Sequence, residues 1–205
     1  MYKIFTAVAA VLCLSTAAFS QTKGTTKFGL QVGYNASTVT ASGLTNSDYR
    51  SGFNAGVSAD HFFSDSWSLK VKALYDQKGW DNGYIAGGMV GGATMITNYK
   101  LDYVSIPVLA NWHFGRTKNW YLNFGPYVGI LLNAKETRSD MDLKEYFNTA
   151  DVGLDVGIGV QFPVSNASRF FIELNGQGGV TDLIKDNQGS TLRSTVSSIN
   201  IGINF

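Results

Sequence analysis

The sequence predicts an all-β fold, an eight-stranded antiparallel up-and-down β-barrel that spans a membrane. Three observations predict it. Eight segments alternate between apolar and polar residues with a period of two, which is the pattern of a strand with two unlike faces. The charged residues of these segments fall on the polar face. The connections between the segments alternate between short and long.

The N-terminal residues have the features of a cleaved secretion signal. Lys3 precedes an apolar run at residues 4–14, which is too short for a transmembrane helix of about 20 residues. Residues 18–20 read Ala-Phe-Ser, a small-x-small cleavage site. We therefore expect a signal peptide at residues 1–20 and one outer-membrane barrel domain at residues 21–205.

The alternating segments are expected to be the strands, in chain order. They cover residues 28–36, 53–63, 67–76, 104–114, 122–133, 152–162, 170–177 and 195–205. In the third, Leu69 and Val71 lie on one face and Lys70 and Lys72 on the other. The last segment ends on the aromatic residue Phe205 and must pair with the first strand to close a barrel.

Charge placement favours lipid over water around the barrel. A charge that faces lipid costs about 2–4 kcal/mol at the bilayer midplane. Residues at alternate positions of a strand share a face, and we call the two sets the apolar and the polar parity. On the apolar parity only Asp102 comes close to a lipid-facing position, at the loop end of its strand. The charged residues on the polar parity, together with Lys78, are expected to point into the lumen and to form ion pairs there: Asp60, Lys70, Lys72, Asp76, Asp155 and Glu173.

Two interpretations of this charged lumen stay open. It could be an ion path or a filter for small solutes. It could instead be a packed ionic plug, which we favour because side chains just fill the interior of an eight-stranded barrel.

The connections set the expected orientation. Three are short, at residues 64–66, 115–119 and 164–167, and four are long, at residues 40–50, 81–100, 134–148 and 181–194. Short periplasmic turns and long outer loops are typical of outer-membrane barrels. We therefore expect both termini in the periplasm and the barrel in the outer-membrane lipid.

Aromatic residues are expected to form girdles at the two membrane interfaces. The girdle at the short-turn end comprises Phe28, Phe63, Trp67, Phe114, Trp120, Phe162, Phe170 and Phe205. A sparser girdle is expected at the loop end, from Phe53, Tyr75, Trp80, Tyr99 and Tyr103.

Two prolines fall inside predicted strands, Pro107 and Pro126. Proline has no N–H for the ladder, and a closed barrel has no free edge on which to place it. We expect β-bulges or local ladder breaks at both positions.

Two stretches give a family resemblance. Residues 101–109, LDYVSIPVL, and 125–132, GPYVGILL, resemble consecutive strands of the PorT-like outer-membrane barrel family of Bacteroidetes. The opening FGLQVGY at residues 28–34 and the final Phe205 are similar as well. The resemblance implies a small closed barrel that the barrel-assembly machinery folds after reading Phe205 as an assembly signal. The family's name comes from a member linked to protein secretion, so secretion-complex proteins are among the implied partners.

No residue pattern predicts a catalytic, cofactor-binding or metal site. The two histidines, His61 and His113, fall on opposite parities near the short-turn end, and nothing in the spacing brings them together with acids. The loop at residues 81–100 is rich in glycine but lacks the GK[ST] of a phosphate loop. A net charge of +1 gives no electrostatic case for nucleic acid.

The sequence favours a non-enzymatic outer-membrane barrel that contributes to envelope architecture or to surface interaction through its outer loops. A small passive pore and an outer-membrane acyltransferase or protease are the alternatives. A soluble barrel with an apolar ligand inside is a further alternative, and it requires the opposite arrangement of apolar and charged faces.

Overall fold

The computed structural model describes residues 23–41, 47–84, 96–185 and 191–205, and the expected signal peptide lies outside them. Within these residues, eight long strands form the barrel. They are β1 (Thr26–Ala41), β2 (Asp48–Phe62), β3 (Trp67–Tyr84), β4 (Ile96–Phe114), β5 (Trp120–Glu136), β7 (Ala150–Pro163), β8 (Arg169–Gly179) and β9 (Leu192–Asn204). Two short elements, β6 (Met141–Asp142) and the 3-10 helix η1 (Lys144–Tyr146), lie in the connection between β5 and β7.

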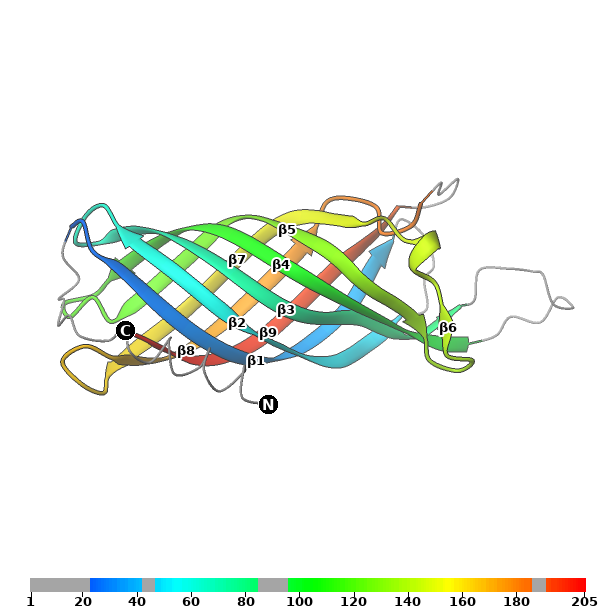
Figure 1. Cartoon of the computed structure of the whole chain (residues 1–205), viewed down its shortest axis with the longest axis horizontal. Helices are drawn as coiled ribbons and strands as arrows, with labels where there is room; N and C mark the ends of the chain where they lie inside the picture. Colours follow the sequence, from blue (N-terminus) through cyan, green and yellow to red (C-terminus); the bar gives the residue numbers. More distant parts are fainter. Residues whose placement is uncertain (1–22, 42–46, 85–95, 186–190) are drawn as a thin grey trace, which may run out of the picture.

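Every long strand pairs antiparallel with both neighbours, and β1 pairs with β9 to close the sheet, with Leu30 opposite Ile203. The predicted eight-stranded antiparallel barrel is therefore confirmed. Figure 1 shows the tilted strands, with the C-terminus and the short turns at one end, which we call the short-turn end. β6 lies at the opposite, long-loop end. In the described residues no helix is long and apolar enough to cross a membrane.

The two faces of the barrel have opposite chemistry. Outward side chains are large and apolar, and Val32 and Leu154 are 55% and 61% exposed. Inward side chains are polar, and Lys72 and Glu173 are only 3% and 1% exposed. The alternative of a soluble barrel with an apolar lumen is therefore wrong.

The strands run further toward the long-loop end than the sequence predicts. β3 has 18 residues and β4 has 19, so both continue well beyond the predicted segments 67–76 and 104–114. β5 and β9 also begin or end inside stretches predicted as loops. Because β3 ends at Tyr84 and β4 begins at Ile96, the loop predicted at residues 81–100 is shortened at both ends. The residues between these two strands lie outside the described parts of the chain.

The expected bulges at the prolines are absent, but the ladder does break beside them. Val71 pairs with Val108 and Leu74 with Ser105, so the register is unchanged although the residues between these pairs, including Pro107, are unpaired. The β4–β5 ladder lapses beside Pro126 in the same way. Proline has no N–H and therefore removes one hydrogen bond from the ladder, but the paired residues on either side keep the register of the two strands.

A β-bulge lies elsewhere, between β4 and β5. Asp102 pairs with Asn133 and Tyr103 with Leu131, so one residue of β5 is extra. An extra residue reverses which face the following side chains occupy. As a result, Ala134 and Glu136 are buried on the inner side at the long-loop end.

The predicted girdle at the long-loop end is wrong for three of its five members. Trp80, Tyr99 and Tyr103 are buried, because they share the parity of the lumenal residues and point inward. They belong to a hydrophobic cluster that we call the apolar cap, formed by Val39, Trp80, Tyr99, Leu101, Tyr103, Leu131, Ala134, Phe147, Leu183 and Leu192. The other two, Phe53 and Tyr75, have their ring centroids 5.7 Å apart.

Candidate functional site

Buried ion pairs cross the lumen. Lys72 Nζ lies 2.6 Å from Glu173 Oε1, which joins β3 to β8 across the barrel. Lys70 Nζ lies 3.7 Å from Asp60 Oδ2 on the adjacent strand. Both pairs consist of residues that the sequence places in the lumen. Because charges removed from water need partners, these pairs fix the side chains that fill the interior.

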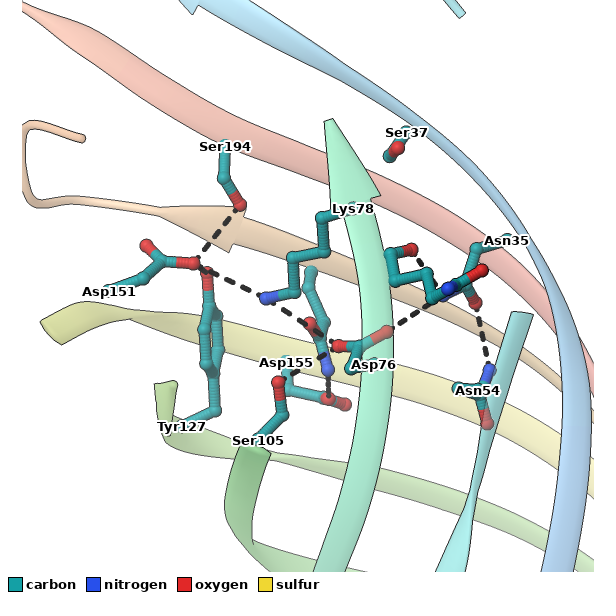
Figure 2. Close-up of polar contacts among 12 residues, drawn as sticks. Asn35, Ser37, Asn54, Asp76, Lys78, Ser105, Tyr127, Asp151, Asp155 and Ser194 are labelled. Atoms are coloured by element: carbon teal, nitrogen blue, oxygen red, sulfur yellow. Dashed lines mark hydrogen bonds and ion pairs between the residues drawn. The ribbon is translucent and has the colours of Figure 1, made fainter. Parts of the chain in front are cut away.

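A third lysine lies nearer the long-loop end. Lys78 Nζ is 3.3 Å from Asp151 Oδ2 and 3.6 Å from Asp76 Oδ2. Figure 2 shows its ammonium group between the two carboxylates. The ring centroids of Tyr127 and Tyr103 lie 4.6 and 5.2 Å from the same Nζ atom. The lysine is thus held by two carboxylates and two aromatic rings.

The sequence reasoning missed Asp151. Its Oδ2 atom accepts hydrogen bonds from the Tyr127 hydroxyl at 3.0 Å and from Ser194 Oγ at 3.2 Å (Figure 2). Asp151 lies one residue before the predicted sixth segment and shares the parity of Asp155. Extending the period of two by one residue would have found it.

An asparagine chain connects the ion pairs. Asn200 donates to Glu173 at 3.5 Å and accepts from Asn54 at 2.8 Å. The same Asn54 amide group donates to Asn35 Oδ1, and Asn35 donates to Asp76 Oδ1 at 2.7 Å. One polar network therefore runs from β8 through β9, β2 and β1 to β3.

A glycine on β1 makes room for this chain. A Cβ atom on Gly33 would lie 1.9 Å from Asn200 Oδ1 and 2.6 Å from Asn54 Nδ2. Any side chain at this position would therefore displace the amides that link the ion pairs.

The last predicted lumenal charge, Asp155, differs from the others. It is 1% exposed, yet no ion pair within 4.0 Å involves it in the described part of the chain. Its two oxygens accept from the side-chain amides of Asn175, at 2.6 Å, and Gln177, at 2.8 Å.

The two histidines lie on opposite faces of the barrel wall. His113 is buried in the lumen, with Nε2 3.0 Å from the Asn111 amide. His61 is on the outer side, with Nδ1 2.9 Å from the Thr26 hydroxyl. Across the residues that the structure describes, no three His, Cys, Asp or Glu side chains are grouped to hold a metal.

The aromatic residues predicted at the short-turn end all lie on the outer parity. Five of them are exposed: Phe28, Phe63, Trp67, Trp120 and Phe162. Phe114, Phe170 and Phe205 are half-buried. The backbone of Phe205 pairs with that of Phe28, at 2.8 and 3.0 Å, where the barrel closes. Recognition of Phe205 by an assembly machinery stays a prediction.

The apolar cap covers the lumen at the long-loop end. The rings of Trp80 and Tyr99 stack with centroids 4.4 Å apart, and Phe147 packs 6.2 Å from Trp80. Phe147 comes from the β5–β7 connection and is bridged to Ile184 in the β8–β9 connection. Leu183, also in the β8–β9 connection, is buried in the cap. Two connections thus fold inward and meet over the barrel.

Glu136 organises the turn beside the cap. Its carboxylate accepts hydrogen bonds from the backbone N–H groups of Arg138, at 2.5 Å, and Ser139, at 2.8 Å, and from the hydroxyls of Ser139 and Thr97. Burial by itself would raise the pKa of this carboxyl, but these hydrogen bonds lower the pKa from 4.5 to about 2.

We expect this turn to loosen in acid. Because the folded pKa of Glu136 is the lower one, its stabilisation is complete above about pH 4.5 and is lost as the pH falls toward 2. Amide hydrogen exchange, corrected for intrinsic rates, should show protection of the Arg138 and Ser139 N–H groups falling over that range. In Glu136→Gln the protection should be low and independent of pH, and an unchanged acid transition in that variant would contradict the assignment.

The apolar exterior, the ionic interior and the closed eight-stranded sheet define a transmembrane β-barrel protein of the outer membrane. A family model described as "Outer membrane protein beta-barrel domain" matches residues 19–185. The chain belongs to this family.

A solved structure shares the fold. The crystal structure of Neisserial surface protein A (NspA) is 18% identical, with a TM-score of 0.51, and the match covers 87% of this chain and 97% of that chain. The outer membrane protein OprG from Pseudomonas aeruginosa is 12% identical, with a TM-score of 0.48, and the match covers 91% of this chain and 98% of that chain. No curated protein matches the sequence.

Proposed function

We propose that the protein is a closed, non-enzymatic barrel that displays its long-loop end at the cell surface and binds a partner there. In this proposal the short-turn end and both termini face the periplasm, as short turns do in outer-membrane barrels. The observation that carries the proposal is the double closure of the lumen, by the ionic network in the middle and by the apolar cap at the long-loop end.

A filled lumen argues against transport. The cavity beside Asp155 has a volume of about 10 Å³, which is room for roughly one water molecule. A solute would have to separate Lys72 from Glu173 and also pass the stacked rings of Trp80 and Tyr99. The interior is therefore suited to holding the barrel rigid.

The long-loop end offers surface for a partner. Strands β3, β4 and β5 continue into a folded extension whose inner side is the apolar cap. On its outside, Tyr49 and Tyr146 are each 66% exposed and Met141 is 55% exposed. Exposed aromatic and methionine side chains are enriched in protein interfaces. A PorT-like role beside secretion-complex proteins is one specific form of this proposal.

We expect no channel activity. Purified barrel in planar bilayers should show no stepwise conductance above background, because the ionic network blocks the lumen. A Phe147→Ala variant, which opens part of the cap, should also stay silent because Lys72 and Glu173 remain paired. Regular current steps from the unmodified protein would instead support the pore.

The partner can be captured directly. A photo-crosslinking amino acid at Tyr146 or Tyr49 should capture a protein in intact cells. The matched control is the same substitution at Phe63, which is 52% exposed at the short-turn end. Equal capture from all three positions would contradict a specific site at the long-loop end.

A further inference from the structure

The outer face of the barrel contains a hollow of about 600 Å³, which extends over β1, β9, β8, β7 and β5 and which we call the outer groove. Its wall toward the short-turn end is a row of large side chains that lie opposite one another in the paired strands: Tyr34, Ile199, Leu174, Ile158 and Leu122. In the next row toward the long-loop end, three opposed positions carry only Ala36, Ser197 and Gly176. The surface is hollowed because these three residues are small.

The outer groove belongs to the face that contacts lipid. Ile199 and Leu174, in its wall, are 55% and 54% exposed, like the other apolar residues of this face. A hydrocarbon chain lying in a groove contacts more protein atoms than one lying on a convex surface, so it gains more dispersion energy. The groove therefore favours an acyl chain that stays in one place.

An arginine lies on the same face at the depth of the lipid headgroups. β9 has 13 residues, Leu192–Asn204, and at about 3.4 Å per residue and a tilt of about 45° it spans roughly 31 Å across the membrane. The apolar band of such barrels is about 25 Å tall. Ser197 therefore lies within the band. Arg193, four residues nearer the long-loop end and exposed, lies beyond it.

The charge of Arg193 is available to a ligand. Three other cations at the long-loop end each have a carboxylate within 4.0 Å, in the pairs Arg50–Asp81, Lys100–Asp102 and Lys135–Asp140. Among the residues that the structure describes, no ion pair within 4.0 Å involves Arg193. One oxygen of Asp182, in the preceding connection, accepts instead from the backbone N–H groups of Ile184 and Leu192, both at 3.1 Å.

We propose that the outer groove and Arg193 together bind one anionic phospholipid from the leaflet at the long-loop end. An acyl chain occupies the groove beside Gly176 and Ser197, and the phosphate accepts hydrogen bonds from the Arg193 guanidinium, whose planar donors match phosphate oxygens. The groove alone would retain any acyl chain. The arginine adds the preference for a negative headgroup, and this site is separate from the protein partner proposed for the long-loop end.

The test is native mass spectrometry of the purified protein in detergent, with equal amounts of phosphatidylglycerol and phosphatidylcholine that carry the same acyl chains. The first lipid bound should be phosphatidylglycerol by about five-fold, the factor that one arginine contributes at an anionic lipid surface. Arg193→Ala should abolish this preference. Lys135→Ala is the matched control, since it removes an exposed cation at the same end that already has a carboxylate partner, and the preference should remain.

A second variant tests the groove without changing any charge. A Cβ atom on Gly176 would meet no atom within 4 Å, so Gly176→Leu can fill the groove without disturbing the barrel. It should lower the binding of both lipids. Ala73→Leu, on the outer face of β3 and outside the groove, should leave the binding of both unchanged. Equal binding of the two lipids by the unmodified protein, an unchanged preference in Arg193→Ala, or dimers that Gly176→Leu dissociates would overturn the proposal.

Discussion

Replacing Glu173 by alanine is expected to destabilise the folded barrel by about 3–5 kcal/mol, because the change leaves Lys72 buried without its partner. Lys72 Nζ and Glu173 Oε1 are 2.6 Å apart, and both side chains are almost completely buried. The Asn123 amide, which donates to Glu173 Oε2 at 2.8 Å, loses its acceptor as well. Chemical denaturation in detergent micelles measures the loss directly.

A second variant can distinguish the destabilisation caused by the unpaired charge of Lys72 from the destabilisation caused by lost packing. A double variant, Lys72→Met with Glu173→Leu, removes both charges and keeps apolar volume, so it should recover most of the stability. A double variant as unstable as Glu173→Ala alone would show that the buried charge is not the cause. The matched surface control is Lys135→Ala, which breaks the exposed pair between Lys135 Nζ and Asp140 Oδ1, 3.0 Å apart. It should cost no more than about 1 kcal/mol.

The strands and their faces could be predicted because a period of two is a local property. Lys70 and Lys72 had to share a face whatever the strands paired with, and lipid excludes charge from the other face. Asp102 is an exception to the exclusion of charge from the outer face. It lies on the outer parity near the long-loop end, where Lys100 is 3.7 Å away and the Asn133 amide donates at 3.4 Å.

The sequence does not predict in the same way which charged residues of the lumen form ion pairs with each other. Parity says that Lys72 and Glu173 point inward, but the register between all the strands decides that they meet across the barrel. The apolar cap could not be predicted for another reason. The aromatic character of Trp80, Tyr99 and Tyr103 predicts a girdle, although their parity is lumenal. Only the inward fold of the connections that contain Phe147 and Leu183 explains how such side chains are buried.

The second large effect concerns the outer face. Val32→Arg should destabilise the barrel in phospholipid vesicles by about 2–4 kcal/mol, the cost of an arginine at the bilayer midplane. Val32 lies on β1, four residues beyond the aromatic Phe28 at the short-turn end, and its side chain is 55% exposed in the absence of lipid. The free energy of unfolding in vesicles is the measurement.

The control lies on the same strand and the same face. Thr40→Arg, eight residues further along β1 and near the long-loop end, should cost only about 0–1 kcal/mol, because the penalty falls toward the interface. A water-facing surface would give another result, since surface substitutions away from special features usually change stability by within about 0.5 kcal/mol. Equal, small effects at both positions would therefore mean that Val32 does not face hydrocarbon, whereas a large difference along one face arises only if that face crosses a bilayer.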